Sequence, residues 1–134
     1  MMYNIKPENG KKQFKIYMSR AKENIEAAEI LFEKKSYRGA VSRAYYGFFE
    51  AASAALITKG FFAKTHAGVI YLFEQHFVRT NEVPAKFSRF FREAKEAREE
   101  ADYKFLEKTT KEDAERIIKT AKEFIEVIEK SVKV

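Results

Sequence analysis

The sequence predicts an all-α protein: a five-helix, largely up-and-down antiparallel bundle with short loops. Three observations indicate this class. Apolar residues recur at three- and four-residue intervals along most of the chain, as on one face of a helix. Only 5 Gly and 2 Pro interrupt the 134 residues, so turns are few and helices are long. No stretch alternates apolar and polar residues as a half-buried strand does. The length suits a single domain with a buried core.

Two long helices are predicted in the N-terminal half. The first runs from about Lys11 to Lys34, and the second, with Ser36 as its candidate N-cap, continues to about Lys59. Gly60 follows, where glycine commonly ends a helix. The second helix is apolar on nearly all sides, so we expect it at the centre of the bundle or beneath another subunit. The apolar face of the first helix comprises Phe14, Tyr17, Ala21, Ile25, Ala28 and Phe32.

Three further helices are predicted in the C-terminal half. Thr65 can cap a third helix over about residues 66–79, and Pro84 suits the first turn of a fourth. Thr110 and Asp113 resemble a capping box at the start of the fifth, with Asp in place of Glu or Gln. The fifth helix carries its apolar residues at regular three- and four-residue spacing: Ala114, Ile117, Ala121, Ile125, Ile128 and Val132.

Composition and charge exclude several kinds of protein. The absence of Cys rules out disulfides and thiolate chemistry and fits a cytoplasmic protein, and two His without Cys cannot build an ordinary zinc site. No Gly-rich phosphate loop occurs, so neither a metal nor a cofactor is predicted. The longest apolar stretch, residues 44–57, is interrupted by Glu50 and is shorter than the roughly 20 residues of a membrane helix. The net charge of +6 permits contact with nucleotide or RNA phosphates without requiring it.

The fourth predicted helix carries an arginine on its apolar face. A core-facing Arg costs several kcal/mol, on the order of 3–5, unless it is paired or functional. Asp102, four residues after Arg98, is the expected partner, although this order of charges is the weaker one on a helix. Arg98 is therefore a candidate phosphate-binding or catalytic residue, and an internal salt bridge is the alternative. The apolar face reads Phe87, Phe91, Ala94, Arg98, Ala101 and Phe105.

Other polar residues within apolar helices are weaker candidates for ligand binding. Arg43 lies seven residues before Glu50 on the same face, so an intrahelical or intersubunit ion pair explains it equally well. Tyr46 suits either a binding site or the core. His66 opens the third helix and could reach the Arg98 site, or it could simply cap or pack. His76, between two Phe residues, is interpreted as structural.

Three segments together carry a family resemblance: residues 37–46 in the second predicted helix, Thr65 and His66 at the start of the third, and residues 97–103 in the fourth. Their order on five helices resembles the HEPN superfamily, the "higher eukaryotes and prokaryotes nucleotide-binding" domain, and most closely its small stand-alone prokaryotic members. The resemblance covers nearly the whole chain. Residues 1–134 are therefore interpreted as one HEPN-like helical domain with its core at about residues 14–132.

The resemblance implies a homodimer with a cleft between subunits, and often a minimal nucleotidyltransferase partner that serves as antitoxin to a HEPN toxin. Many members are metal-independent ribonucleases whose signature on the fourth helix is Arg, four to six residues, then His. That Arg matches Arg98, and Glu99 is the polar residue after it. Tyr103 stands at the His position, and Tyr, with a pKa of about 10, is a poor base. Asp102 and His66 are the remaining candidates for proton transfer.

Three hypotheses about function follow. The leading one is a protein that binds nucleotide or RNA phosphates at Arg98, Asp102 and Tyr103, together with a nucleotidyltransferase as in toxin–antitoxin pairs. The second is an active ribonuclease toxin in which Tyr103, Asp102 or His66 replaces the usual His. The third is a helical interaction module without a ligand of its own. A tetratricopeptide array is disfavoured because no second copy of the repeat follows.

Overall fold

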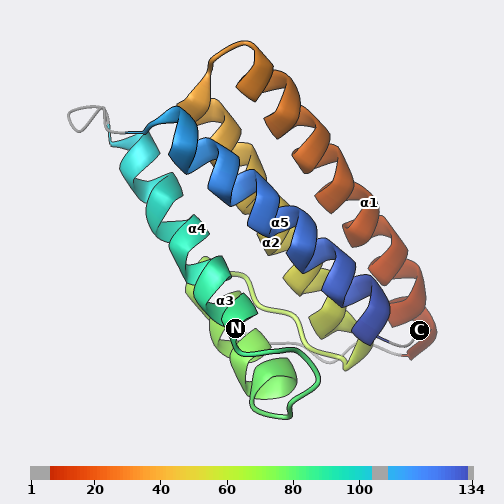
Figure 1. Ribbon diagram of the computed structural model, residues 1–134. Coiled ribbons are helices and arrows are strands. Elements are labelled where there is room, and N and C mark those ends of the chain that lie inside the picture. The colour runs from red at the N-terminus through yellow and green to blue at the C-terminus, as the bar shows by residue number, and fades with distance from the viewer. Residues whose placement is uncertain (1–6, 104–108, 133–134) are drawn as a thin grey trace.

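The computed structural model describes residues 7–103 and 109–132, and it confirms the predicted all-α bundle. Figure 1 shows the long helices α1, α2, α4 and α5 packed lengthwise, running alternately up and down, with α3 at one end of the bundle. Residue 105, the last predicted position of the apolar face on the fourth helix, lies outside the described residues. The elements are α1 (Pro7–Glu33), α2 (Tyr37–Thr58), α3 (His66–Phe73), the π-helical segment η1 (Glu74–Val78), α4 (Lys86–Asp102) and α5 (Lys111–Ser131).

Helix α2 lies at the centre of the bundle, as its nearly continuous apolar sequence predicts. It packs against α1, α3, α4 and α5. The ring of Phe48 on α2 stacks on Phe91 of α4 with 5.6 Å between centroids, and it contacts Phe124 of α5 at 5.0 Å. This aromatic layer joins the three helices, so it fixes the position of α4 relative to α2.

The helix ends follow local capping rules in most cases. The Thr65 hydroxyl accepts a hydrogen bond from a backbone N–H of α3, and Thr110 and Asp113 form the predicted capping box. Gly60 ends α2 with a φ of 82°, a conformation that favours glycine. The prediction for Ser36 was half right: it is the N-cap residue of α2, but its side chain makes no capping hydrogen bond within the described part of the chain.

The third predicted helix changes its winding after Phe73 and continues as the π-helical η1. Glu74 in this segment accepts hydrogen bonds from Ser88 at 2.6 Å and from Arg92, both on α4. The His76 ring stacks on Phe61 with 3.9 Å between centroids, in agreement with its structural interpretation. Segment η1 thus holds α3 against the first turns of α4.

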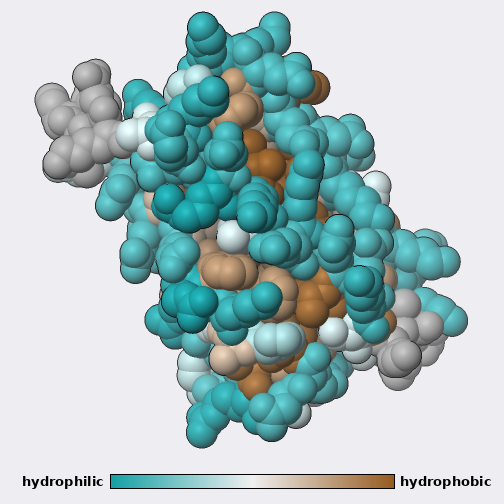
Figure 2. Space-filling model, in the orientation of Figure 1, coloured by the Kyte–Doolittle hydropathy of each residue, from teal (hydrophilic) through white to brown (hydrophobic). Residues whose placement is uncertain are grey.

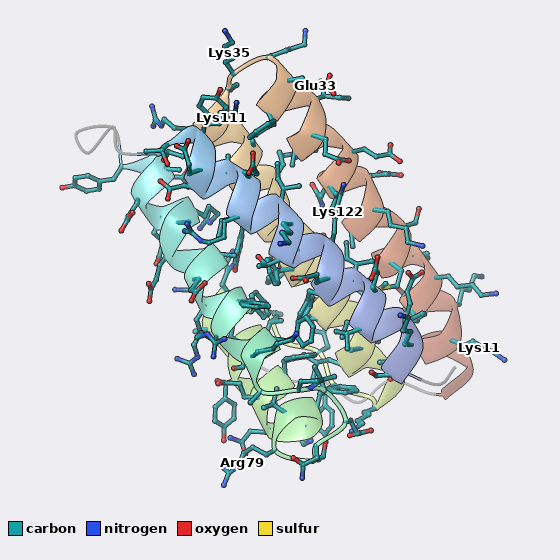
Figure 3. The ribbon with its side chains drawn as sticks, viewed as in Figure 1. Lys11, Glu33, Lys35, Arg79, Lys111 and Lys122 are labelled. Atoms are coloured by element: carbon teal, nitrogen blue, oxygen red, sulfur yellow. The ribbon has the colours of Figure 1, made fainter. Side chains whose placement is uncertain are left out.

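Charged and polar side chains cover most of the face shown in Figure 2, with apolar side chains visible in narrow gaps between them. The charged side chains of Lys11, Lys35 and Arg79 extend outward from the bundle in Figure 3. Lys122 on α5, also labelled there, forms an ion pair with Glu29 on α1. None of the described helices is long and apolar enough to cross a membrane.

Candidate functional site

The guanidinium group of Arg98 lies over two tyrosine rings of the central helix. Its Cζ atom is 5.2 Å from the ring centroid of Tyr45 and 5.6 Å from that of Tyr46. Tyr45 is fully buried and Tyr46 is partly buried. Because α4 packs on α2, a charged side chain on the inner face of α4 meets these aromatic rings, which attract a cation through their electron-rich faces.

His66 joins the same cluster from the start of α3. Its Nδ1 atom is 2.5 Å from the hydroxyl oxygen of Tyr45, and its ring lies 5.9 Å from that of Tyr46. Thr65 caps the helix immediately before it and thereby fixes the histidine at the first helical position. We use the term Arg98 site for Arg98, Asp102, Tyr45, Tyr46 and His66.

The electrostatics of the Arg98 site favour an uncharged histidine. Burial, and then the positive charges of Arg98 and Lys95, lower the pKa of His66 below its ordinary value. Burial raises the pKa of the Tyr45 phenol far above its ordinary value, so this hydroxyl stays protonated. His66 is therefore a neutral imidazole at physiological pH.

The contact with Tyr45 also bears on which ring nitrogen of His66 carries the proton. Tyr45 is fully buried, and His66 Nδ1 is the acceptor available to its hydroxyl among the described residues. A buried hydroxyl that failed to donate would incur a desolvation penalty. We therefore assign Tyr45 as the donor, which leaves the proton of His66 on Nε2. In this tautomer His66 presents an N–H donor instead of a base.

The hydrogen-bond donors of Arg98 are only partly paired with acceptors in the described part of the protein. Its Nη1 donates to Asp102 at 3.1 Å, but the Asp102 side chain is 55% exposed while that of Arg98 is 23% exposed. The Nε atom of Arg98 is buried and has no hydrogen-bond partner among the described residues. A pair that is half in solvent contributes little to stability. The hydrogen-bonding groups of Arg98 are therefore only partly paired within the described part of the chain.

One contact to the end of α4 was missed by the sequence interpretation. Nε of Arg38, on the first turn of α2, donates to the backbone carbonyl of Ala101 at 2.6 Å. Carbonyls in the last turn of a helix have no partner within the helix, so this bond caps α4 beside Asp102. Arg38 had no distinguishing spacing in the sequence. Tyr45 was missed as well, because its position on an apolar face favoured a core role.

The remaining predicted site residues lie at different distances from this cluster. Tyr103 directly follows α4 in extended backbone, with φ −86° and ψ 96°, and the residue is 59% exposed. Arg43 is exposed on α2, one turn before Tyr46. The structure thus brings His66, Tyr46, Arg98 and Asp102 together. No group of three or more His, Cys, Asp or Glu side chains in the described residues is arranged to hold a metal ion.

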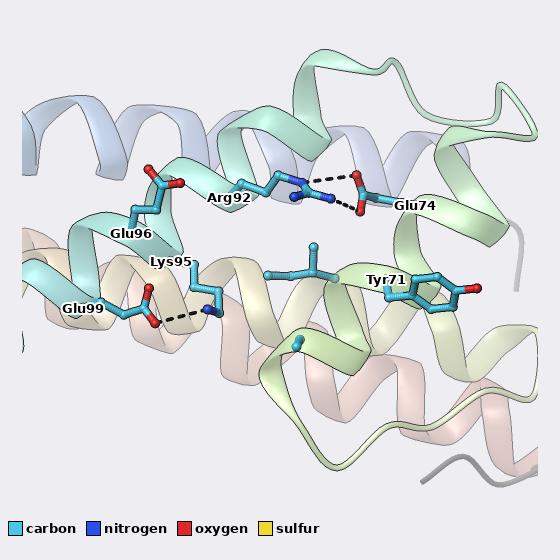
Figure 4. Close-up of a pocket in the computed structure, with 8 residues that line it drawn as sticks. Tyr71, Glu74, Arg92, Lys95, Glu96 and Glu99 are labelled. Carbon is cyan, nitrogen blue, oxygen red and sulfur yellow. Dashed lines mark hydrogen bonds and ion pairs between the residues drawn. The ribbon is translucent and has the colours of Figure 1, made fainter.

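A pocket of about 340 Å³ opens between α3 and α4, next to the Arg98 site. We call it the α3–α4 pocket. Figure 4 shows Arg92 pointing to Glu74 across one part of it and Lys95 pointing to Glu99 in another, with Tyr71 at the edge. The two cations in the pocket are therefore already paired with carboxylates.

The helical fold and the polar cluster around Arg98 define a small helical-bundle protein. Comparison with known families then identifies its relationship: the HEPN domain family matches residues 14–131, and the chain belongs to this family. The resemblance predicted from residues 37–46, 65–66 and 97–103 is therefore confirmed at the level of the family.

Relatives of similar length include one archaeal and one bacterial protein. The Methanocaldococcus jannaschii protein named "Putative toxin MJ0605" is 44% identical over 113 residues, 84% of each chain. A UPF0332 protein of Thermotoga maritima is 33% identical over 113 residues, 84% of this chain and 86% of that one. The crystal structure of TT1696 from Thermus thermophilus superposes with a TM-score of 0.78 over 90% of this chain and 98% of the other, at 15% identity, so this likeness concerns the fold alone.

Proposed function

We propose that this protein is a toxin-like HEPN protein that binds RNA or nucleotide phosphates at the Arg98 site in the cytoplasm. The observation that carries the proposal is the state of Arg98: a cation held over two aromatic rings, with an exposed carboxylate as its ion-pair partner and a buried Nε that lacks one. An arginine fork suits phosphate oxygens, which can accept two hydrogen bonds from it. The toxin names of relatives support the assignment.

In this proposal His66 and Arg98 act together. The Nε2–H group of His66 donates to the bound phosphate, and Arg98 supplies the positive charge. Asp102 keeps the guanidinium oriented through its contact at 3.1 Å. Tyr103, the residue that follows α4, contacts the ribose or base of the ligand in this proposal.

Metal-free RNA binding and cleavage by purified protein test this function. Wild type is compared with Arg98→Met and with Arg89→Met as the matched control. Arg89 lies on the same helix, has a carboxylate four residues later, and lies over the Phe90 ring at 5.5 Å, but its side chain is 65% exposed. Loss of binding in Arg98→Met but not in Arg89→Met supports the proposal. Equal binding by all three proteins contradicts it.

Ribonuclease activity is the second candidate, and the position of His66 favours it. An imidazole beside Arg98 could replace the signature histidine whose place Tyr103 takes. Cleavage without metal needs a base that removes the proton of the ribose 2′-hydroxyl as this oxygen attacks phosphorus, and a donor that protonates the departing 5′-oxygen. With the proton on Nε2, His66 cannot be that base, so phosphate binding remains the leading function. Cleavage by wild type that His66→Gln abolishes would reverse this order.

We infer that two copies associate through the α2 face that carries Arg43 and Glu50. The Oε2 atom of Glu50 is buried without a hydrogen-bond partner among the described residues; burial raises the pKa of this carboxyl, and the positive charge of Arg20 opposes that rise. A two-fold axis between the two residues would pair Arg43 of one protomer with Glu50 of the other, twice. Light scattering tests this: Arg43→Glu should give a monomer, whereas Arg79→Glu, at an exposed turn, should leave the dimer intact. A monomeric wild type contradicts the inference.

A nucleotidyltransferase partner is proposed from the HEPN relationship and the toxin names of relatives. Co-expression with a nucleotidyltransferase encoded beside this gene, followed by purification through a tag on one protein, tests the association. Relief of growth arrest by the partner would support a toxin–antitoxin pair. Separate elution, together with unrelieved toxicity, would contradict it.

A further inference from the structure

The α3–α4 pocket lies beside the Arg98 site, and the function proposed above makes no use of it. Ala67 and Ile70 of α3 contribute apolar surface to the pocket, and Ala67 directly follows His66. Lys95 of α4 also lines it, one helical turn before Arg98 on the same face. A polymeric ligand with one group at Arg98 therefore meets this pocket with the adjoining group.

The charges in the pocket suit hydrogen-bond donors better than phosphate. Arg92 is paired with Glu74, and Lys95 with Glu99 at 3.2 Å. Glu96 adds a third carboxylate, which makes no hydrogen bond or ion pair with any other described residue. The pocket lining thus has three carboxylates and two cations, so it is negatively charged and repels a second phosphate. The carboxylates can still accept hydrogen bonds from N–H groups.

Tyr71 gives the pocket a flat aromatic edge. Tyr71 is 59% exposed, and Figure 4 shows its ring at one end of the residues that line the pocket, on the side of Glu74. The volume of about 340 Å³ lies at the small end of the range of about 300–1,000 Å³ typical of ligand pockets. Exposed aromatic rings beside basic residues are the surfaces on which unpaired nucleobases stack.

We propose that the α3–α4 pocket holds one base of single-stranded RNA whose neighbouring phosphate lies at Arg98, and that it prefers a base with an exocyclic amino group. The inference rests on the proposed function and names its substrate class: an RNA strand, as opposed to a free mononucleotide. Adenine, cytosine and guanine each have an amino group that donates to the Glu96 carboxylate. Uracil has no amino group, and its single donor on that edge, N3–H, lies between two carbonyl oxygens that the carboxylate repels.

Binding of short RNA strands separates this inference from the proposed function. The probes are fluorescent hexamers of A, C or U with 2′-O-methyl ribose, which cannot be cleaved through the 2′-oxygen. Wild type is compared with Tyr71→Ala, Tyr71→Phe, Glu96→Gln and Arg98→Met. Glu115→Gln on α5, in a groove between α1 and α5, is the control for loss of one carboxylate.

Wild type should bind the A and C strands at least about fivefold more tightly than the U strand. Tyr71→Ala should weaken binding of A and C about fivefold or more, the lower end of what stacking one base contributes, while Tyr71→Phe retains it. Glu96→Gln should reduce the preference against U, since an amide also donates, and Glu115→Gln should not change it.

The opposite results overturn the inference. If Arg98→Met loses binding while Tyr71→Ala and Glu96→Gln bind all three strands like wild type, the base subsite is wrong and the phosphate site stands. If Arg98→Met binds like wild type, the phosphate site itself is wrong, and the subsite that depends on it is wrong too.

Discussion

Replacing Arg98 by Met should separate a binding role from a structural one. The substitution removes two contacts with aromatic rings, each contributing about 0.5–1 kcal/mol at a partly exposed position. It also removes the ion pair with the exposed Asp102, which contributes about 0.2–1 kcal/mol. Against these losses, it eliminates a buried Nε whose missing partner costs about 1–3 kcal/mol. The stability lost with these contacts and the stability gained by removing Nε therefore differ by no more than about 2 kcal/mol.

Arg98→Met should therefore unfold within about 8 °C of wild type in a thermal melt. Its affinity for RNA should fall about tenfold or more, because a charge-assisted hydrogen bond to phosphate contributes about 1.5–3 kcal/mol. Arg89→Met should change neither quantity appreciably, since Arg89 is mostly exposed. The reasoning is refuted if Arg98→Met loses more than about 3 kcal/mol of stability while binding RNA like wild type, which is what a purely structural ion pair predicts.

Three further predictions concern the residues around Arg98. Tyr45→Phe should remove the donor to His66 Nδ1, so it should destabilise the protein by about 1–3 kcal/mol and raise the pKa of His66. Nitrogen NMR of the wild type should show the Nε2–H tautomer of His66. An Nδ1–H signal in the wild type would contradict the assignment. Because folding lowers the pKa of His66, the unfolded chain binds more protons than the folded one as the pH drops through about 6.5, and the free energy of unfolding should fall there. The dependence of this free energy on pH should be weaker in His66→Gln. The same pH dependence in both proteins would argue against a lowered pKa. Arg38→Met should cost about 1 kcal/mol by freeing the Ala101 carbonyl, with faster hydrogen exchange at the end of α4, and unchanged exchange there would show that the cap is unimportant.

The helices were predictable because their signals are local. The three- and four-residue spacing of apolar side chains depends only on the helical repeat, and the Thr110 and Asp113 capping box lies within one turn. Ser36 shows the limit of local rules, since the helix begins after it without using its hydroxyl. The π-helical turn at Glu74 was not predictable from spacing, because its side chain bonds to α4, which is distant in sequence.

The site was predictable in its residue types but only partly in its geometry. Arg98 and Asp102 are four residues apart on one helix, so their contact follows from helical geometry. The approach of His66 to Tyr45 does not, because it depends on how α3 crosses α2. Tyr45 was not predicted as a site residue, because an aromatic residue on an apolar helix face has the same sequence pattern whether or not its hydroxyl has a partner. In the structure Tyr45 is fully buried.

The position of Tyr103 shows why a signature spacing need not preserve a role. Helix α4 ends at Asp102, and Tyr103 continues in extended backbone, so helical geometry no longer relates its side chain to Arg98. Even on a continued helix, a separation of five residues would turn its side chain well away from the face of Arg98. His66 instead brings an imidazole to the tyrosine rings that hold Arg98. In this structure an arginine of α4 and a histidine of α3 lie against the same tyrosine rings, so replacing His66 is a more informative test of the site than introducing histidine at position 103.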